Sequence, residues 1–162
     1  MAIDSGAFRK IIGNFATGVV VVTTANDGLL HGVTVNSLAS LSLDPLLLLV
    51  CIDRKAHAHA ELEKCQSFGV NILGAEQSDL SNLFAAVGEP EKGRLRGAAW
   101  RYGCSGCPLI ADSLAWLECR VTDRWAGGDH TIFVGEVLGG EVVRPQGAPL
   151  VYFRGGYRSV IP

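Results

Sequence analysis

The segment Val19-Val20-Val21-Val22-Thr23-Thr24 places six β-branched residues in succession, and the turn-forming residues Asn26-Asp27-Gly28 follow it. Because β-branched side chains crowd a helix and suit a pleated strand, this segment predicts a buried strand. Asn, Asp and Gly accept the backbone angles of a tight hairpin turn. We therefore expect residues 31–41 to return as an antiparallel partner strand.

The rest of the chain continues this succession of strands and turns. Residues 117–125 alternate between apolar and polar side chains, which indicates a strand with one solvated face. Residues 46–52 form a continuous apolar run, which is typical of a buried strand. The other expected elements are helices over 4–15, 56–64 and 76–87, strands over 68–73, 130–143 and 150–153, and an irregular surface segment over 88–106.

These elements predict a single, mainly β domain over residues 1–162. Six or more strands joined by tight turns, with a few short helices between them, are typical of a closed or nearly closed antiparallel barrel. No strand–helix–strand unit begins with a Gly-rich fingerprint, so the sequence does not support a doubly wound dinucleotide-binding fold.

The composition limits the partners. Only 19% of the residues are charged and 48% are hydrophobic, so we expect a homodimer that buries part of the apolar surface. The net charge is −2 and no basic run exceeds Arg54-Lys55, which argues against binding to nucleic acid. The apolar runs are too short for a membrane helix, and residues 1–5 resemble no export signal. We therefore expect a cytoplasmic protein with no membrane partner.

Small polar residues are concentrated in the segment His31-Gly32-Val33-Thr34-Val35-Asn36-Ser37. Gly32 would let a ligand approach the backbone, and Thr34, Asn36 and Ser37 supply hydrogen-bond donors and acceptors along one strand. This pattern suits a flat heteroaromatic ligand with a hydrogen-bonding edge. It equally suits a barrel strand whose hydroxyls bond to neighbouring strands.

The motif Cys104-Ser105-Gly106-Cys107 suggests a metal or redox site at first sight. A closed structural zinc site needs four ligands, and no second cysteine pair lies at suitable spacing. Pro108 places the motif in a loop and not at the start of a helix. We expect no metal site, and five cysteines without an export signal are expected to be reduced thiols.

Several short motifs follow one another in one order along nearly the whole chain. They are Ala16-Thr17-Gly18-Val19, Gly32 to Ser37, Leu41-Ser42-Leu43-Asp44-Pro45, Phe68-Gly69-Val70-Asn71, Leu80-Ser81-Asn82-Leu83-Phe84, Gly106-Cys107-Pro108, Gly128-Asp129-His130 and Tyr152-Phe153-Arg154-Gly155-Gly156-Tyr157. Together they resemble the short-chain flavin reductases, the reductase components of two-component flavin-dependent monooxygenases. The resemblance implies an antiparallel split β-barrel of Greek-key, FMN-binding type with a few short flanking helices.

The same resemblance implies an activity and a set of contacts. The activity is transfer of hydride from NADH or NADPH to FMN or FAD, which supplies reduced flavin to a partner monooxygenase. The implied flavin contacts are Gly32, Val33, Thr34, Asn36, Ser37, Cys51, Ile52, Asp53, Lys55, His57, Ala58 and Phe84. The implied contacts on the nicotinamide side are Asp129, His130 and Tyr157.

His130 is the implied catalytic residue. For a lone histidine after a glycine turn the default explanation is a cap of that turn, but the Gly-Gly-Asp context and the match to the family motif favour a place beside the nicotinamide. Hydride transfer removes no proton from the substrate carbon, so no general base is needed. We expect His130 to position the nicotinamide and to act electrostatically.

One departure from the family pattern concerns the phosphate. Many relatives carry Arg immediately before the residue that matches Phe84, where a cation can hold phosphate, and here that position is Leu83. Arg54, Lys55 and His57 are candidate substitutes. Two alternatives to a reductase stay open, namely a tightly FMN-bound electron-transfer protein and a non-enzymatic flavin-binding module.

Overall fold

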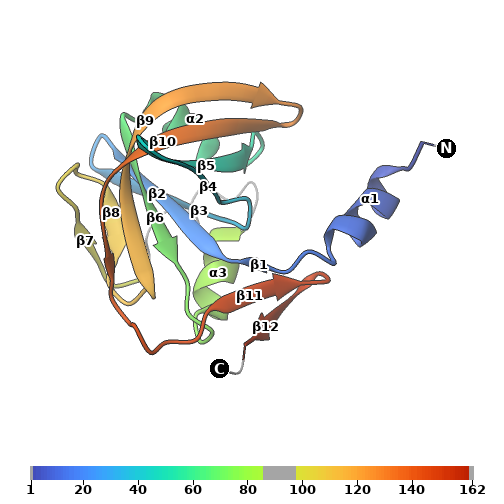
Figure 1. Ribbon diagram of the computed structural model, residues 1–162. Helices are drawn as coiled ribbons and strands as arrows, with labels where there is room; N and C mark the ends of the chain where they lie inside the picture. Colours follow the sequence, from blue (N-terminus) through green and yellow to red (C-terminus); the bar gives the residue numbers. More distant parts are fainter. Residues whose placement is uncertain (1, 86–97, 161–162) are drawn as a thin grey trace.

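The computed structural model describes residues 2–85 and 98–160, and Figure 1 shows the arrangement of the chain. Most of the elements are strands, which confirms the mainly β prediction. In chain order they are α1 (Ser5–Ile12), β1 (Thr17–Gly18), β2 (Val20–Asn26), β3 (Leu29–Val35), β4 (Ala39–Leu43), β5 (Leu46–Asp53), α2 (His59–Lys64), β6 (Ser67–Ile72), α3 (Ser78–Ala85), β7 (Trp100–Tyr102), β8 (Pro108–Ile110), β9 (Ala115–Gly127), β10 (His130–Val142), β11 (Leu150–Phe153) and β12 (Gly156–Ser159).

The hairpin of β2 and β3 forms where the sequence predicts it. The two strands pair antiparallel, from Val20 opposite Val35 to Asn26 opposite Leu29. Asp27 and Gly28 form the turn with φ angles of 50° and 75°, the left-handed angles that a two-residue hairpin of this type requires. The β-branched run that led to the prediction is buried in the sheet.

Seven strands form one antiparallel sheet in the order β3-β2-β6-β9-β10-β5-β4. The antiparallel pairing is as predicted, but the strands of the described residues do not close into a complete barrel. β3 and β4 are its two edges, and they do not pair with each other. Two smaller sheets, β1-β11-β12 and β7-β8, accompany it (Figure 1).

The prediction of one continuous strand over residues 31–41 is wrong. β3 ends at Val35, residues 36–38 are irregular, and β4 begins at Ala39. The reason lies in the tertiary structure, because β3 and β4 occupy opposite edges of the sheet and the chain must cross between them. Asn36 and Ser37 of this crossing segment, residues 36–38, form part of one wall of the candidate site.

Three smaller expectations also need correction. The helix predicted over 56–64 is shorter, because α2 begins only at His59. The segment expected to be irregular, 88–106, includes strand β7, while residues 86–97 and the end of the helix predicted over 76–87 lie outside the described residues. Strand β12 was not expected, and it pairs with β11.

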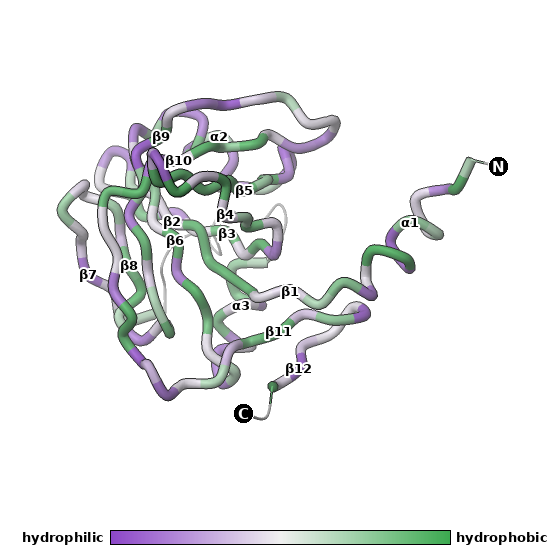
Figure 2. The backbone as a smooth tube through the Cα atoms, in the orientation of Figure 1, coloured by the Kyte–Doolittle hydropathy of each residue, from purple (hydrophilic) through white to green (hydrophobic). Residues whose placement is uncertain are grey.

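Two clusters of buried apolar side chains form the core. The larger cluster includes Ile52, Phe68 and Phe133 and packs strands of the main sheet together. The smaller cluster includes Phe84 and Leu150, and it fastens α3 and β11 to the sheet. Figure 2 shows the apolar colour running along the strands that supply these residues.

Helix α1 stands apart from the sheet (Figure 1). Asp4 caps it by accepting a hydrogen bond from the amide of Ala7 at 2.7 Å. None of its residues is buried, although Phe8, Ile11 and Ile12 lie at helical spacing and are 51–61% exposed. None of the helices in the described part of the chain has the length and apolarity needed to cross a membrane.

Candidate functional site

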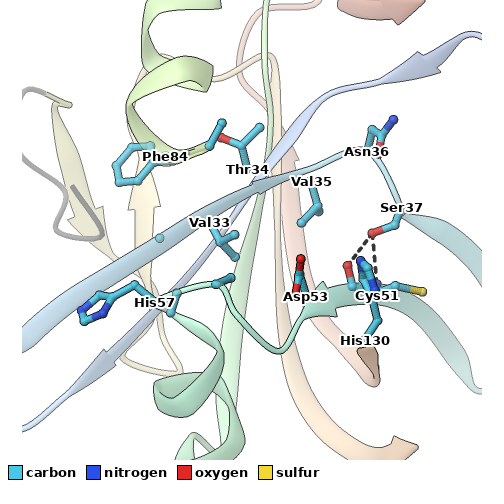
Figure 3. Close-up of a pocket in the computed structure, with 14 residues that line it drawn as sticks. Val33, Thr34, Val35, Asn36, Ser37, Cys51, Asp53, His57, Phe84 and His130 are labelled. Atoms are coloured by element: carbon cyan, nitrogen blue, oxygen red, sulfur yellow. Dashed lines mark hydrogen bonds between the residues drawn. The ribbon is translucent and has the colours of Figure 1, made fainter. Parts of the chain in front are cut away.

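A pocket of about 190 Å³ lies along the end of β3. Figure 3 shows His57 and Phe84 toward one end of it and Ser37, Cys51 and His130 toward the other. Its walls come from β3 and the crossing segment, from β5 and the turn after it, from α3, and from the first residue of β10. The lining residues are Gly32, Val33, Thr34, Val35, Asn36, Ser37, Cys51, Asp53, Ala56, His57, Ala58, Phe84, Ala85 and His130.

The pocket therefore brings together most of the residues that the sequence singled out, from four separate parts of the chain. Sequence reasoning missed Val35, Ala56 and Ala85, which also line the pocket. Small apolar side chains carry no chemical signal of a site. Only their position between or beside predicted contacts could have indicated them.

Four residues singled out from the sequence do not line this pocket. Side chains alternate along β5, so Ile52 points into the larger apolar cluster while Cys51 and Asp53 line the pocket. Lys55 and Asp129 have exposed side chains outside the lining. Tyr157 lines a second, adjoining pocket. Ile52 thus supports the site from behind, and Tyr157 and His130 line different pockets.

The backbone of β3 is the most distinctive wall of the pocket. β3 is an edge strand that pairs only with β2 among the described strands. An edge strand presents a row of N–H and C=O groups without strand partners. Residues 32–37 line the pocket, so these backbone groups are within reach of a ligand with a hydrogen-bonding edge.

The hydroxyl groups of this segment serve the protein itself. Thr34 Oγ1 donates to the carbonyl of Ser81 at 2.7 Å. Ser37 Oγ donates to the carbonyl of Cys51 at 2.7 Å and accepts from the amide of Cys51 at 3.1 Å, the bonds dashed in Figure 3. These contacts fit the structural explanation of the polar residues. Of the three polar side chains, Asn36 is the exposed one, and it lines the pocket with its neighbours.

A neighbouring aromatic ring leaves no room for a side chain at position 32, so this position requires glycine. A Cβ atom at this position would lie 2.9 Å from two ring carbons of Phe84. Phe84 is buried and anchors α3 against the sheet. The absence of a side chain at Gly32 therefore lets α3 pack against β3, a role different from the ligand approach that the sequence suggested.

His130 lies at the end of the pocket, opposite Asp53 in the pairing of β10 with β5. Its Nδ1 is 2.7 Å from Oδ1 of Asp129, whose carboxyl is 85% exposed. The hydrogen bond from His130 lowers the pKa of Asp129. When Nδ1 donates to this carboxylate, Nε2 of a neutral imidazole is an acceptor.

Cys51 and His57 are two further side chains of the pocket that bear on how it could hold a ligand. Burial raises the pKa of the Cys51 thiol, so Cys51 contributes a neutral side chain. Of the three candidate substitutes for the phosphate-binding arginine, His57 lines the pocket, whereas Arg54 and Lys55 are exposed outside its lining. Leu83 packs against the smaller apolar cluster.

Comparison with known proteins identifies the class to which this fold and pocket belong. The family model described as "Flavin reductase like domain" matches residues 12–160. The chain belongs to this family.

Similar proteins with stated roles support this assignment. The chain is 38% identical over 160 residues to the reductase component of 4-nitrophenol 4-monooxygenase/4-nitrocatechol 2-monooxygenase from Rhodococcus opacus, covering 99% of this chain and 83% of that protein. It is 37% identical to the reductase subunit HsaB of a flavin-dependent monooxygenase from Mycobacterium tuberculosis, covering 99% and 84%. The NADH:FAD oxidoreductase SgcE6 of Streptomyces globisporus superposes with a TM-score of 0.90 at 35% identity, covering 100% and 98%.

Proposed function

We propose that this protein is a flavin reductase that transfers hydride from NADH or NADPH to FMN or FAD. The observation that carries the proposal is the pocket in which the free edge of β3 faces Cys51, Asp53 and His130. A flavin ring is flat and apolar on its faces and carries donors and acceptors along one edge. It therefore matches a pocket with an open strand edge and mostly small side chains, in whose described lining Asp53 is the one carboxylate.

The residues of the pocket divide into two groups by their proposed contacts. Residues 32–37 hold the ring edge through backbone groups, with Cys51 and Asp53 on the facing wall. His57 is the proposed partner of the flavin phosphate, because it is the basic residue among the three candidates that lines the pocket. When bound there, the flavin supplies the hydride acceptor, and the protein supplies binding, orientation and polarity.

His130 is the proposed positioning group for the nicotinamide. The bond to Asp129 fixes the imidazole ring, and its Nε2 can accept a hydrogen bond from the carboxamide of the nicotinamide. Productive transfer needs the reacting atoms about 3–3.5 Å apart, so one well-placed hydrogen bond has a direct effect on rate. The protein moves no proton in this step.

We also propose that the curled sheet is the split barrel of the family and that two copies form a homodimer. The exposed stripe of α1, with Phe8, Ile11 and Ile12, needs an apolar partner. Edge strand β4 and the start of β5 offer one, because Leu43 is 82% exposed and Leu46 is exposed beside it. Since both surfaces belong to the same chain, a second copy can satisfy both at once.

A partner monooxygenase and a cytoplasmic location complete the proposal. The relatives described above are named as reductase components of monooxygenases, which supports an oxygenase as the user of the reduced flavin. The five cysteines of this chain are free thiols, in keeping with a reducing compartment.

A steady-state assay tests the proposed activity. NADH and NADPH are each combined with riboflavin, FMN and FAD, and nicotinamide oxidation is followed. A reductase that releases its product gives a rate that rises with added free flavin. A rate independent of added flavin supports the tightly bound electron-transfer alternative, and no oxidation with any pair supports the non-enzymatic module.

A further inference from the structure

The second pocket, which Tyr157 lines, takes no part in the proposed contacts to the flavin ring, its phosphate or the nicotinamide. Its volume is about 460 Å³, and it shares Thr34, Val35, Asn36 and Ala85 with the first pocket. A ligand that extends beyond the first pocket can therefore enter the second without leaving the protein surface. The other lining residues are Val19, Asn82, Tyr152, Gly155, Gly156 and Tyr157.

The described lining of this second pocket is uncharged and partly aromatic. It contains no Asp, Glu, Lys or Arg. The rings of Tyr152 and Tyr157 meet edge to face, with centroids 5.8 Å apart and planes at 65°. Aromatic walls without charge suit a neutral planar ring and offer no counter-charge to a phosphate.

A directed chain of hydrogen bonds crosses this pocket wall. The hydroxyl of Tyr157 donates to Oδ1 of Asn82 at 3.1 Å. Because that hydroxyl has one proton, its 2.8 Å contact with Ser81 must be donated by Ser81 Oγ, whose side chain is 0% exposed. The chain from Ser81 through Tyr157 fixes the amide of Asn82. The second lone pair of Oδ1 and the two protons of Nδ2 are left for other contacts.

Ser81 also fixes the border between the two pockets. Its carbonyl accepts the hydrogen bond from Thr34 Oγ1, and Thr34 lines both pockets. One buried residue of α3 thus holds β3 on one side and β12 on the other. The two pockets are therefore neighbours in a set geometry.

The chemistry of the reaction indicates which group enters the second pocket. The nicotinamide ring must lie against the flavin, so it occupies the mouth of the first pocket. The half of a dinucleotide that remains is adenosine, which is neutral and planar at its base. An Asn amide pairs with adenine through an oxygen that accepts from N6 and a nitrogen that donates to N7.

We propose that the second pocket binds the adenosine half of a dinucleotide, with Asn82 reading the adenine edge and the two tyrosines forming the aromatic wall. The proposal rests on the proposed function, because the dinucleotide is either FAD or NADH. Both carry adenosine, and the same pocket chemistry serves either one.

The test compares ligands that differ only by the adenosine part. In the first arm, the affinities of the full-length protein for FAD and FMN are measured by titration without nicotinamide. In the second arm, KM values for NADH and for reduced nicotinamide mononucleotide are measured with FMN as acceptor. The variants are Asn82→Ala and Tyr157→Phe, and Asp79→Ala is the control because it is exposed on the same helix outside both pockets.

Asn82→Ala is expected to lower one of the two preferences for the adenosine-bearing ligand about tenfold, as loss of a bidentate adenine contact does. Tyr157→Phe is expected to lower the same preference by a smaller factor, and Asp79→Ala neither. A change in the FAD/FMN ratio assigns the adenosine to the flavin, and a change in the NADH arm assigns it to the nicotinamide nucleotide.

Asn82→Ala that alters neither ratio would overturn the proposal, as would a wild-type protein without any preference for adenosine-bearing ligands. Failure of the proposed function looks different. In that case the wild-type protein oxidises no nicotinamide with any flavin, while the flavin arm still decides whether adenosine binds here.

Discussion

Ser37, in the segment that connects the edge strands β3 and β4, forms two hydrogen bonds with Cys51 of β5. The Ser37 hydroxyl donates to the Cys51 carbonyl and accepts from the Cys51 amide. On its other side Cys51 pairs with Ile132 of β10. The side chain of Ser37 thus takes the place of a neighbouring strand. It holds the crossing segment against β5, and both residues line the candidate flavin pocket.

Replacing Ser37 by Ala should therefore affect both stability and flavin binding. The variant leaves the N–H and C=O groups of Cys51 without this partner, which costs about 2 kcal/mol of unfolding free energy. FMN affinity should fall in parallel, because the pocket wall is no longer fixed. Urea denaturation and FMN titration measure the two effects. Ser40→Ala, an exposed serine on β4, serves as control. A Ser37→Ala protein with wild-type stability and affinity would refute this role of the hydroxyl.

His130→Ala should impair the nicotinamide step more than flavin binding. Loss of one hydrogen bond to the carboxamide corresponds to about 1.4 kcal/mol, or about tenfold in kcat/KM for NADH. Asp129→Asn keeps the shape of the exposed partner and should have a smaller effect. Steady-state kinetics with FMN held at saturation measures this. An unaltered kcat/KM in His130→Ala would show that His130 only caps the turn.

The Cys104-to-Cys107 motif forms part of a turn that binds a carboxylate. Glu118 is 4% exposed and accepts hydrogen bonds from the amides of Cys104 at 3.0 Å and Ser105 at 2.9 Å, and from the Ser105 hydroxyl at 2.6 Å. Burial raises the pKa of Glu118, but these hydrogen bonds outweigh it and hold the pKa below its usual range. The carboxylate thus attaches the turn before β8 to β9.

Glu118→Gln should destabilise the fold in a pH-dependent way. Since the folded pKa lies below the unfolded value, ionised Glu118 stabilises the fold above the unfolded pKa, and this stabilisation is lost as pH falls through the folded pKa. We expect a loss of about 2 kcal/mol at neutral pH, with the gap to wild type narrowing in the acid range. Denaturation across this pH range measures it.

The matched control for Glu118 is Glu141→Gln, which breaks an exposed ion pair with Arg101. Such pairs contribute at most about 1 kcal/mol, so the control should remain close to wild type at every pH. If Glu118→Gln shows the same small, pH-independent change, then the carboxylate is not a stabilising charge.

The proposed homodimer should depend on the apolar stripe of α1. Ile11→Asp places a charge in the middle of that stripe and should shift the protein to a monomer. Size-exclusion chromatography with light scattering measures the mass. Lys10→Ser on the same helix replaces a polar residue and should leave the mass unchanged. A wild-type monomer, or a dimer unaffected by Ile11→Asp, would contradict the use of this surface.

The sequence predicted those parts of the fold that depend on local signals. The β2–β3 hairpin formed where Asp27 and Gly28 could take left-handed angles. The break between Val35 and Ala39 was not predictable, because apolar and polar residues continue through it. Its cause is the pairing of β4 with β5 at the far edge of the sheet.

The same limit applies to the site. The polar segment at 32–37 lines a pocket in the structure, but the contacts of its residues differ in part from those that the sequence suggested. Gly32 accommodates Phe84, and Thr34 and Ser37 bond within the protein. Packing between segments that are distant in the sequence decides which residues contact each other. The spacing of residues along the chain does not show these contacts. Ser81 hydrogen-bonds to both Thr34 and Tyr157. In the sequence it is one residue of the motif Leu80 to Phe84, and nothing there indicates these two contacts.

A crystal structure of the protein soaked with FMN would show where the flavin binds. We expect density for the three-ring system along residues 32–37, with Cys51 and Asp53 on the facing wall and His130 at one end. Flavin density at a different place, with the free edge of β3 covered by protein atoms, would contradict it.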